Sequence, residues 1–218
     1  MGKRFDLIVF DWDGTLMDSA ALIVNSVQAA ACDLGLAPPS DERARHIIGL
    51  GLIDALRHAL PDLAPSHYEK VAERYRHHYL SRDHELNLFQ GAARLVEELA
   101  QAEFLLGVAT GKSRRGLDRA LDGSGLRTFF HATRCADECQ SKPNPQMLEE
   151  LMDEFGVSRE ATLMIGDTTH DLLMARNAGC EALAVAYGAH PREALEDAAP
   201  LGCVASVDEL AAWLRVNA

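Results

Sequence analysis

The alternation of helical segments and short apolar runs from residue 91 onward restricts the fold more than any other feature of the chain. Apolar runs with the length and composition of strands occupy residues 5–10, 104–109, 129–133, 162–165 and 182–186. Segments with helical spacing occupy residues 91–102, 113–121, 143–155 and 171–178. A last helix begins at the capping box of Ser206 and Glu209. Strands that alternate with helices predict an α/β fold with a doubly wound, mostly parallel, Rossmann-like sheet.

The first strand is separated from the others by a block in which no strand pattern occurs. Helical spacing in this block is found at residues 19–35, 41–48 and 52–60, and after a capping box formed by Ser66 and Glu69. A helical insertion into an α/β domain explains this order most simply. We therefore expect a catalytic core made of residues 1–16 and 88–218, and a helical cap made of residues 17–87.

Composition excludes several classes of partner. The formal net charge of −12 disfavours binding to nucleic acid or to an anionic membrane surface. No apolar run approaches the roughly 20 residues that a membrane span needs, and the short run after Lys3 and Arg4 reads as a strand and not as a signal peptide. The odd number of cysteines, five, indicates reduced thiols and a cytoplasmic protein.

Polar residues follow four of the predicted strands. In an open parallel sheet, ligands bind beyond the carboxyl ends of the strands. The polar residues expected to converge there are Asp11, Asp13, Thr110, Gly111, Lys142, Asp167 and Asp171. No one of these segments is specific by itself, but four of them in this order indicate a site.

The two aspartates after the first strand have the chemistry of phosphoryl transfer. One carboxylate, Asp11, can attack phosphorus and form an aspartyl-phosphate. The other, Asp13, can protonate the leaving oxygen and then deprotonate water. A hard divalent cation such as Mg²⁺ would remove the repulsion between carboxylate and phosphate, with Asp11, Asp167 and the Asp13 carbonyl as its expected ligands.

The remaining residues of the set complete a phosphate site. Asp171 is expected to hold metal-bound water or to orient the lysine. The Thr110 hydroxyl and the Gly111 amide would bind phosphate oxygens at a helix N-terminus. Lys142 would supply positive charge to the transferring group.

These segments resemble the motifs of the haloacid dehalogenase-like hydrolase superfamily, in the branch with a helical cap after the first motif. The chain matches them with Asp11-x-Asp13-Gly-Thr-Leu-x-Asp18-Ser19, Thr110-Gly111, Lys142-Pro143 and Gly166-Asp167-x-x-x-Asp171. That branch includes phosphoglycolate phosphatases. The resemblance implies a magnesium-dependent phosphatase of a small phosphorylated metabolite, with Asp11 as nucleophile, Asp13 as acid/base, Thr110 and Lys142 as phosphate-binding residues, and Asp167 as a metal ligand.

Several alternatives remain open. Dehalogenases of this superfamily lack the second aspartate, so the presence of Asp13 disfavours dehalogenation. Relatives that cleave phosphonates also replace it, and they use a cap lysine, whereas Lys70 is the only lysine of the cap and lies late in it. A sugar phosphomutase keeps both aspartates, and a binding protein without catalytic activity would be a third possibility. 2-Phosphoglycolate is the first candidate substrate, and the sequence does not indicate the oligomeric state.

The positive charges of the cap are interpreted as surface residues. The cap cations that would be able to bind a substrate carboxylate are Arg43, Arg45, His46, Arg57 and Lys70. Each of them alone is more typical of a solvated helix face. His170 lies between two predicted site residues, but the proposed chemistry does not require it.

Overall fold

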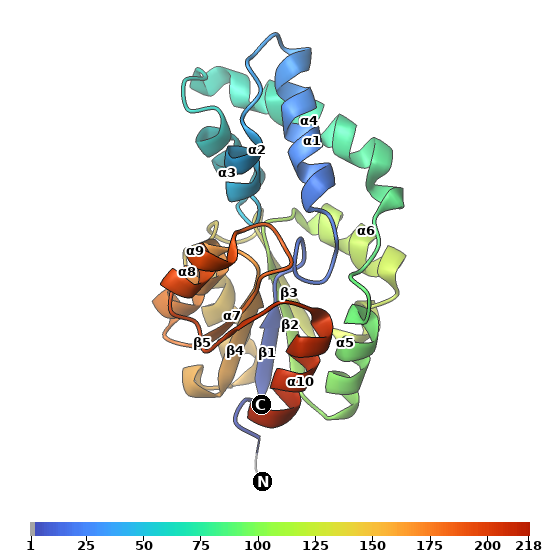
Figure 1. The fold of residues 1–218 in the computed structure, drawn as a ribbon, viewed down its shortest axis with the longest axis vertical. Helices are drawn as coiled ribbons and strands as arrows, with labels where there is room; N and C mark the ends of the chain where they lie inside the picture. The colour runs from blue at the N-terminus through green and yellow to red at the C-terminus, as the bar shows by residue number, and fades with distance from the viewer. Residues whose placement is uncertain (1–2) are drawn as a thin grey trace.

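The computed structural model describes residues 3–218 and contains one six-stranded parallel sheet (Figure 1). The strands are β1 (Leu7–Phe10), β2 (Leu105–Thr110), β3 (Ala132–Cys135), β4 (Thr162–Gly166), β5 (Glu181–Val185) and β6 (Cys203–Val204). Their spatial order is β3-β2-β1-β4-β5-β6, so β1 lies in the middle and the chain crosses from one half of the sheet to the other. The predicted doubly wound α/β fold is therefore confirmed.

Helices cover both faces of the sheet because β1 is apolar on both. Ile8 and Phe10 belong to one core cluster, and Leu7 and Val9 belong to another. The first cluster is completed by α5 (Ala92–Gln101), α6 (Arg114–Ser124) and α10 (Val207–Asn217). The second is completed by α7 (Gln146–Phe155), α8 (Thr169–Ala178) and α9 (Arg192–Asp197). A strand buried on both faces is typical of a parallel sheet.

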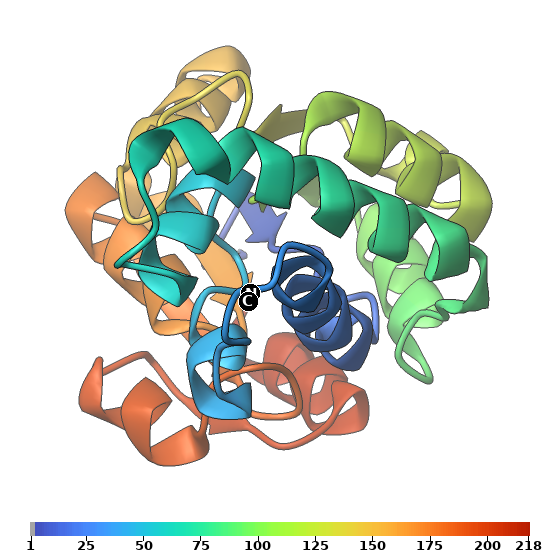
Figure 2. The same cartoon turned by 90° about the horizontal axis from the view of Figure 1, so that it is seen from above.

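Four helices between β1 and α5 have a hydrophobic cluster of their own. They are α1 (Ala20–Asp33), α2 (Asp41–His46), α3 (Leu52–Ala59) and α4 (Tyr68–Arg82), with short 3-10 turns at Pro65–His67 and Asp83–Glu85. They gather beyond one end of the sheet (Figure 1), and they cover that end when the molecule is seen from above (Figure 2). We use the name cap for residues 17–87; this boundary remains the prediction made from the sequence.

The two connections between the cap and the core run side by side. Met17 and Leu88 form an antiparallel bridge, the Asp18 amide donates to the Asn87 carbonyl (3.0 Å), and the Phe89 amide donates to the Leu16 carbonyl (2.9 Å). A displacement of the cap would therefore act on both connections together.

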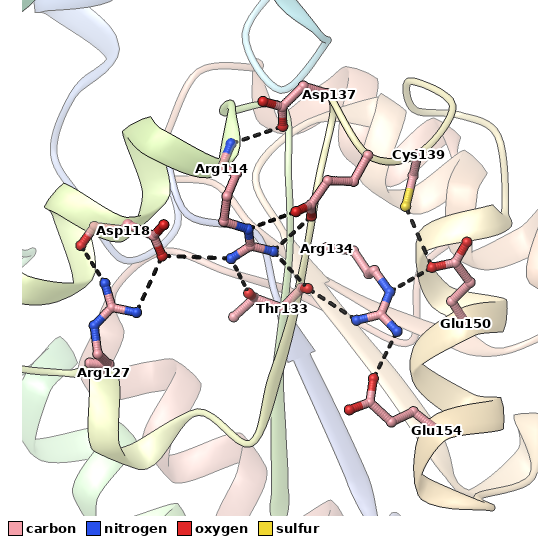
Figure 3. A network of polar contacts seen from close by, with 10 residues as sticks. Arg114, Asp118, Arg127, Thr133, Arg134, Asp137, Cys139, Glu150 and Glu154 are labelled. Atoms are coloured by element: carbon pink, nitrogen blue, oxygen red, sulfur yellow. Dashed lines mark hydrogen bonds and ion pairs between the residues drawn. The ribbon is translucent and has the colours of Figure 1, made fainter.

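The edge strand β3 carries a network of charged side chains (Figure 3). Arg114 of α6 donates from Nη2 to Oε2 of Glu138 (2.7 Å). Arg134 of β3 donates to Glu150 (2.6 Å) and to Glu154 (2.7 Å) of α7. Charged side chains on an edge strand oppose the addition of a further strand.

Some predicted boundaries are wrong, each for a local reason. The strand predicted at 129–133 begins at Ala132, because α6 is longer than expected and a 3-10 turn follows it. The helix predicted from residue 143 begins at Gln146, since Asn144 precedes a proline and is disfavoured in helical conformation. The capping box of Ser66 and Glu69 does not form, because a 3-10 turn leads directly into α4.

Two elements were not predicted, α9 and β6, and both are very short. None of the helices within residues 3–218 combines the length and the apolar character required to cross a membrane.

Candidate active site

The register of the central strands brings the ends of three of them to one place. Phe10 of β1 is paired with Val108 of β2 and with Ile165 of β4. The residues that follow each of these strands therefore emerge at the same edge of the sheet, on the side where the cap lies. This is the edge at which the sequence places the polar residues.

Three buried carboxylates meet at this edge. Asp11, Asp167 and Asp171 are all 0% exposed, and one oxygen of each lies within 4.8 Å of the others. Lys142 Nζ is 2.9 Å from Asp11 Oδ1 and donates a hydrogen bond to Asp171 Oδ1 at 2.6 Å. Lys142 is thus paired with two of the three carboxylates, and Asp167 has no cation beside it among the described residues.

The electrostatics of this cluster show a shortage of positive charge. Burial, opposed by Lys142, raises the pKa of Asp11 from 3.8 to about 7. Burial and the Asp11 charge also raise the pKa of Asp167 well above its usual value. Although burial alone would lower the pKa of Lys142, the charges of Asp11 and Asp171 outweigh burial and raise it. The lysine stays charged, but it does not balance the three carboxylates.

The donor atoms of this cluster fit a hard divalent cation. Neither carboxylate oxygen of Asp11 has a hydrogen-bond partner, although both are buried. Lys142 lies at ion-pair distance from one of them, but it directs its hydrogen bond to Asp171. Buried carboxylate oxygens without partners are costly unless a cation binds them. An all-oxygen donor set is the kind that Mg²⁺ prefers.

The surroundings hold Asp167 and Asp171 in fixed positions. Asp167 accepts hydrogen bonds from Thr15 Oγ1 (2.9 Å) and from the Ala189 amide (2.7 Å). Asp171 Oδ2 accepts from the hydroxyl of Thr168 (2.7 Å), the capping residue of α8, which leaves Oδ1 for Lys142. Gly14 has a φ of +84°, and a Cβ there would collide with the Asp167 carboxylate. The glycine of the first motif therefore provides both a turn and space for a site residue.

Asp13 is held by other residues than the three carboxylates are. Its Oδ1 accepts a hydrogen bond from Ser19 Oγ (2.6 Å), and its Oδ2 lies 2.9 Å from Lys112 Nζ. Lys112 also donates to the hydroxyl of Tyr79 on α4, at 2.9 Å. The predicted acid/base is thus connected to the cap through a lysine that was not predicted as a site residue. Only its place directly after Thr110-Gly111 pointed to it.

The Thr110-Gly111 segment lies in contact with the cap. Thr110 is buried, and its Oγ1 accepts from the Lys112 amide at 3.2 Å, so its proton is available to a ligand. A Cβ on Gly111 would lie 2.5 Å from the carbonyl oxygens of Gly49 and Leu50. Only a glycine permits this approach of the cap to the core.

Comparison with known proteins agrees with this arrangement. The family model described as haloacid dehalogenase-like hydrolase matches residues 8–185. The chain belongs to the haloacid dehalogenase-like hydrolases.

Individual relatives of this hydrolase cover nearly the whole chain. A phosphoglycolate phosphatase of Vibrio cholerae is 30% identical over 207 residues, which are 91% of this chain and 92% of the relative. The probable phosphatase IndB of Dickeya dadantii is 34% identical and covers 94% of this chain and 91% of its own length. The crystal structure of a predicted phosphoglycolate phosphatase from Haemophilus somnus superposes with a TM-score of 0.87 at 21% identity, over 100% of both chains. This last likeness concerns the fold alone.

Three histidines of this hydrolase connect the cap to the core. Nε2 of His170 and Nε2 of His190 lie 2.7 and 3.2 Å from the backbone oxygen of His46. A carbonyl can only accept, so both imidazoles donate from Nε2. Nδ1 of His190 accepts from the Thr169 amide (3.1 Å), which places the proton of this ring on Nε2.

The histidine cluster is therefore a hydrogen-bonded contact and not a ready metal site. Burial and the neighbouring His170 lower the pKa of His190 to about 4, which keeps the ring neutral. A metal bound through Nε2 of His170 or His190 would have to displace the Nε2 proton, which forms the hydrogen bond to the His46 carbonyl. His170, interpreted from the sequence as a neighbouring polar residue, contributes to the contact between cap and core.

A cavity of about 590 Å³ lies between the cap and the core, beside Asp13. Among the cap cations named from the sequence, Arg43, Arg45, His46, Arg57 and Lys70, none lines this cavity. The basic residues that line it are Arg76 of α4 and Lys112, Arg115 and Arg119 of the core. Helical spacing alone did not distinguish Arg76 from the other charged residues of α4.

The structure brings most of the predicted site residues to one edge. Asp11, Lys142, Asp167 and Asp171 form one cluster, and Asp13 belongs to an adjacent group with Lys112. Their individual roles, including that of the Asp13 carbonyl as a metal ligand, remain predictions.

Proposed function

We propose that this hydrolase is a magnesium-dependent phosphatase of small phosphomonoesters that acts through an aspartyl-phosphate on Asp11. The observation that carries the proposal is the buried Asp11 carboxylate, which lacks hydrogen-bond partners and lies beside Lys142 and Asp167. Curated relatives named phosphoglycolate phosphatase support 2-phosphoglycolate as the first substrate to test.

Asp11 and Asp167 would hold Mg²⁺ through side-chain oxygens, with the Asp13 carbonyl as a further ligand. When bound, the cation supplies the positive charge that lets an anionic carboxylate approach an anionic phosphate. Asp171 acts on Lys142, because its Oδ1 accepts the lysine hydrogen bond at 2.6 Å.

The side chains of the chain divide the reaction between them. An oxygen of Asp11 attacks phosphorus, while Lys142 and the Thr110 hydroxyl stabilise charge on the phosphoryl oxygens. Asp13 gives a proton to the leaving alcohol in this step. In the second step Asp13 takes a proton from the water that attacks phosphorus, and Asp11 is released.

The contacts of Asp13 describe one of its two states. Ser19 donates to its carboxylate and Lys112 forms an ion pair with it, which suits the ionised state that accepts a proton from water. Donating a proton in the first step requires the Lys112 contact to loosen. Lys112 lines the cap cavity, so a substrate that enters the cavity is placed to do this.

The cap would limit the access of water to Asp11. Its loop at Gly49 and Leu50 lies on Gly111, and the Gly51 amide donates to Ser141 Oγ of the core at 2.9 Å. Enclosure protects an acyl-phosphate from premature loss. We retain a cytoplasmic location as part of the proposal, in keeping with five unpaired cysteine thiols.

The experiment is the release of inorganic phosphate from p-nitrophenyl phosphate, measured with Mg²⁺ and after chelation. We expect activity that needs the cation and is lost in Asp11→Asn. Activity that survives either change would refute the mechanism, and transfer of the phosphoryl group to a sugar in preference to water would indicate a phosphomutase.

A further inference from the structure

We propose that the cap cavity binds phosphomonoesters whose leaving group combines an apolar portion with a second anionic group, and that Arg76 and Arg115 bind that anion. The inference rests on the proposed function, because it concerns the part of the substrate that Asp11 does not touch. It begins with the lining of the cavity beside Asp13.

Most of the cap residues that line the cavity are apolar. Ile23 and Val27 of α1, Leu56 of α3 and the rings of Tyr75 and Tyr79 on α4 line it. The two tyrosine rings stack at a centroid distance of 5.7 Å. Such a wall favours carbon and ring atoms over a hydrated polyol.

The volume of the cavity exceeds what a two-carbon leaving group fills. Glycolate has five non-hydrogen atoms, which occupy about 150 Å³ at the roughly 30 Å³ of liquid volume that one water takes. The cavity measures about 590 Å³. A leaving group larger than glycolate therefore fits in the cavity beside Asp13.

Two arginines that line the cavity, one from the cap and one from the core, lack acidic partners among the described residues. Arg76 lies on α4 of the cap and Arg115 on α6 of the core, and both are exposed at its lining. Within residues 3–218, neither lies within 4.0 Å of a carboxylate, although the chain has a net charge of −12. Arg114, the neighbour of Arg115, is by contrast held by Glu138 in the network at the β3 edge (Figure 3).

The carboxylates that line the cavity have partners other than Arg76 and Arg115. Asp13 is paired with Lys112, Asp54 with Arg57 (2.9 Å), and Asp137 accepts from the Arg114 amide (2.8 Å). Two guanidinium groups that face one cavity without a counterion form an attractive site for a carboxylate or phosphate.

The position of this pair also connects anion binding to the cap. Arg119 of α6 lies 3.4 Å from Asp83, which follows α4, so the C-terminal end of α4 lies near α6 (Figure 1). An anion held by both Arg76 and Arg115 would add a further bridge between the cap and the core. Substrates with this anion would therefore close the cap over Asp11 more effectively.

The test compares substrates that differ only in the second anion. The pairs are 4-carboxyphenyl phosphate with phenyl phosphate, and 2-phosphoglycolate with ethyl phosphate. We expect wild-type kcat/KM to favour the carboxylated member of each pair by about tenfold, the effect of a charge-assisted hydrogen bond. Arg76→Gln and Arg115→Gln should each remove most of this preference, mainly through KM, and leave the uncharged substrates within about twofold.

Arg176→Gln is the matched control, because Arg176 is exposed on α8 and does not line the cavity. Thermal unfolding of each variant checks that it is folded. Because Arg76 lies in the cap and Arg115 in the core, the test can still be made if one of the two variants fails to fold. A wild-type preference below twofold, or an equal loss with both members of a pair, would overturn the inference. If phenyl phosphate is hydrolysed in an Asp11-dependent manner without such a preference, only this inference fails. If Asp11→Asn retains activity, the proposed function fails with it.

Discussion

The carboxylate cluster at the sheet edge and the cavity of the cap differ in almost every physical respect. In the cluster, Asp11, Lys142 and Asp167 are almost fully buried and come from the ends of rigid strands and the segments that follow them. In the cavity, apolar side chains from separate helices form a wall, and Arg76 and Arg115 lie exposed beside it. The first region concentrates charge, and the second provides space.

This difference indicates a division of labour. Groups that act on phosphorus must be held closely, because a displacement of about 1 Å can cost about 100-fold in rate. Groups that select the leaving group tolerate rearrangement as the cap moves. Substitutions in the cluster should therefore affect every substrate, whereas substitutions in the cavity should change the ranking of substrates.

The largest effect is expected for Asp11→Asn. The amide keeps the shape of the side chain but removes the nucleophile, so kcat should fall by about 10⁴-fold or more with every phosphomonoester. Phosphate release from p-nitrophenyl phosphate and 2-phosphoglycolate measures this loss. A loss restricted to one substrate would show that Asp11 belongs to substrate selection.

The next effect is expected for Asp13→Asn and should depend on the leaving group. Removal of a general acid costs about 10²–10⁴-fold when the leaving alcohol needs a proton. p-Nitrophenolate leaves readily without one, so the loss with p-nitrophenyl phosphate should be smaller than with ethyl phosphate. Equal losses with both esters would contradict the role of Asp13 as proton donor.

A smaller effect is expected where the cap meets the core. Gly111→Ala places a methyl group 2.5 Å from the Gly49 and Leu50 carbonyl oxygens and should displace the cap loop, which lowers kcat/KM by about 100-fold. Gly123→Ala is the control, because nothing lies within 4 Å of a Cβ at that position of α6. Similar activities of the two variants would show that this contact is not needed for turnover.

The smallest effect concerns the stability of the metal-free protein. The pKa of Asp11 is raised from 3.8 to about 7, so between these values the folded protein binds more protons than the unfolded chain. The contribution of the protonated Asp11 carboxyl to the stability of the folded protein is complete below pH 3.8. It is lost as the pH rises to about 7. In the presence of a chelator, the Tm of the wild type should fall relative to that of Asp11→Asn between pH 5 and pH 7.5. A constant difference would contradict the raised pKa.

The sequence predicted the charged cluster better than the cavity for a physical reason. Asp11, Asp167 and Asp171 directly follow strands or cap a helix, and parallel strands deliver such residues to one edge whatever the details of packing. This prediction needed only the order of strands and helices along the chain and no distances between side chains. Even β3, whose start is three residues later than expected, delivers its loop and Lys142 to the same edge.

The cavity depended on distances that no local pattern contains. Arg76 is one of several charged residues on α4, and its position at the cavity follows from how α4 packs on α1 and from how its end lies near α6. The pairing of Lys112 with Asp13 and Tyr79 joins three separate segments. The short elements α9 and β6 were missed because so few residues show no clear periodicity.

The most direct test of the account is to trap the covalent intermediate. Asp13→Asn, incubated with Mg²⁺ and p-nitrophenyl phosphate and quenched in acid, should accumulate an acyl-phosphate because the attack of water is slowed. Mass spectrometry of the digested protein should locate one added phosphoryl group on the peptide that contains Asp11, and hydroxylamine should remove it. Turnover without a phosphorylated peptide, or a phosphoryl group on any other residue, would contradict the claim that Asp11 is the nucleophile.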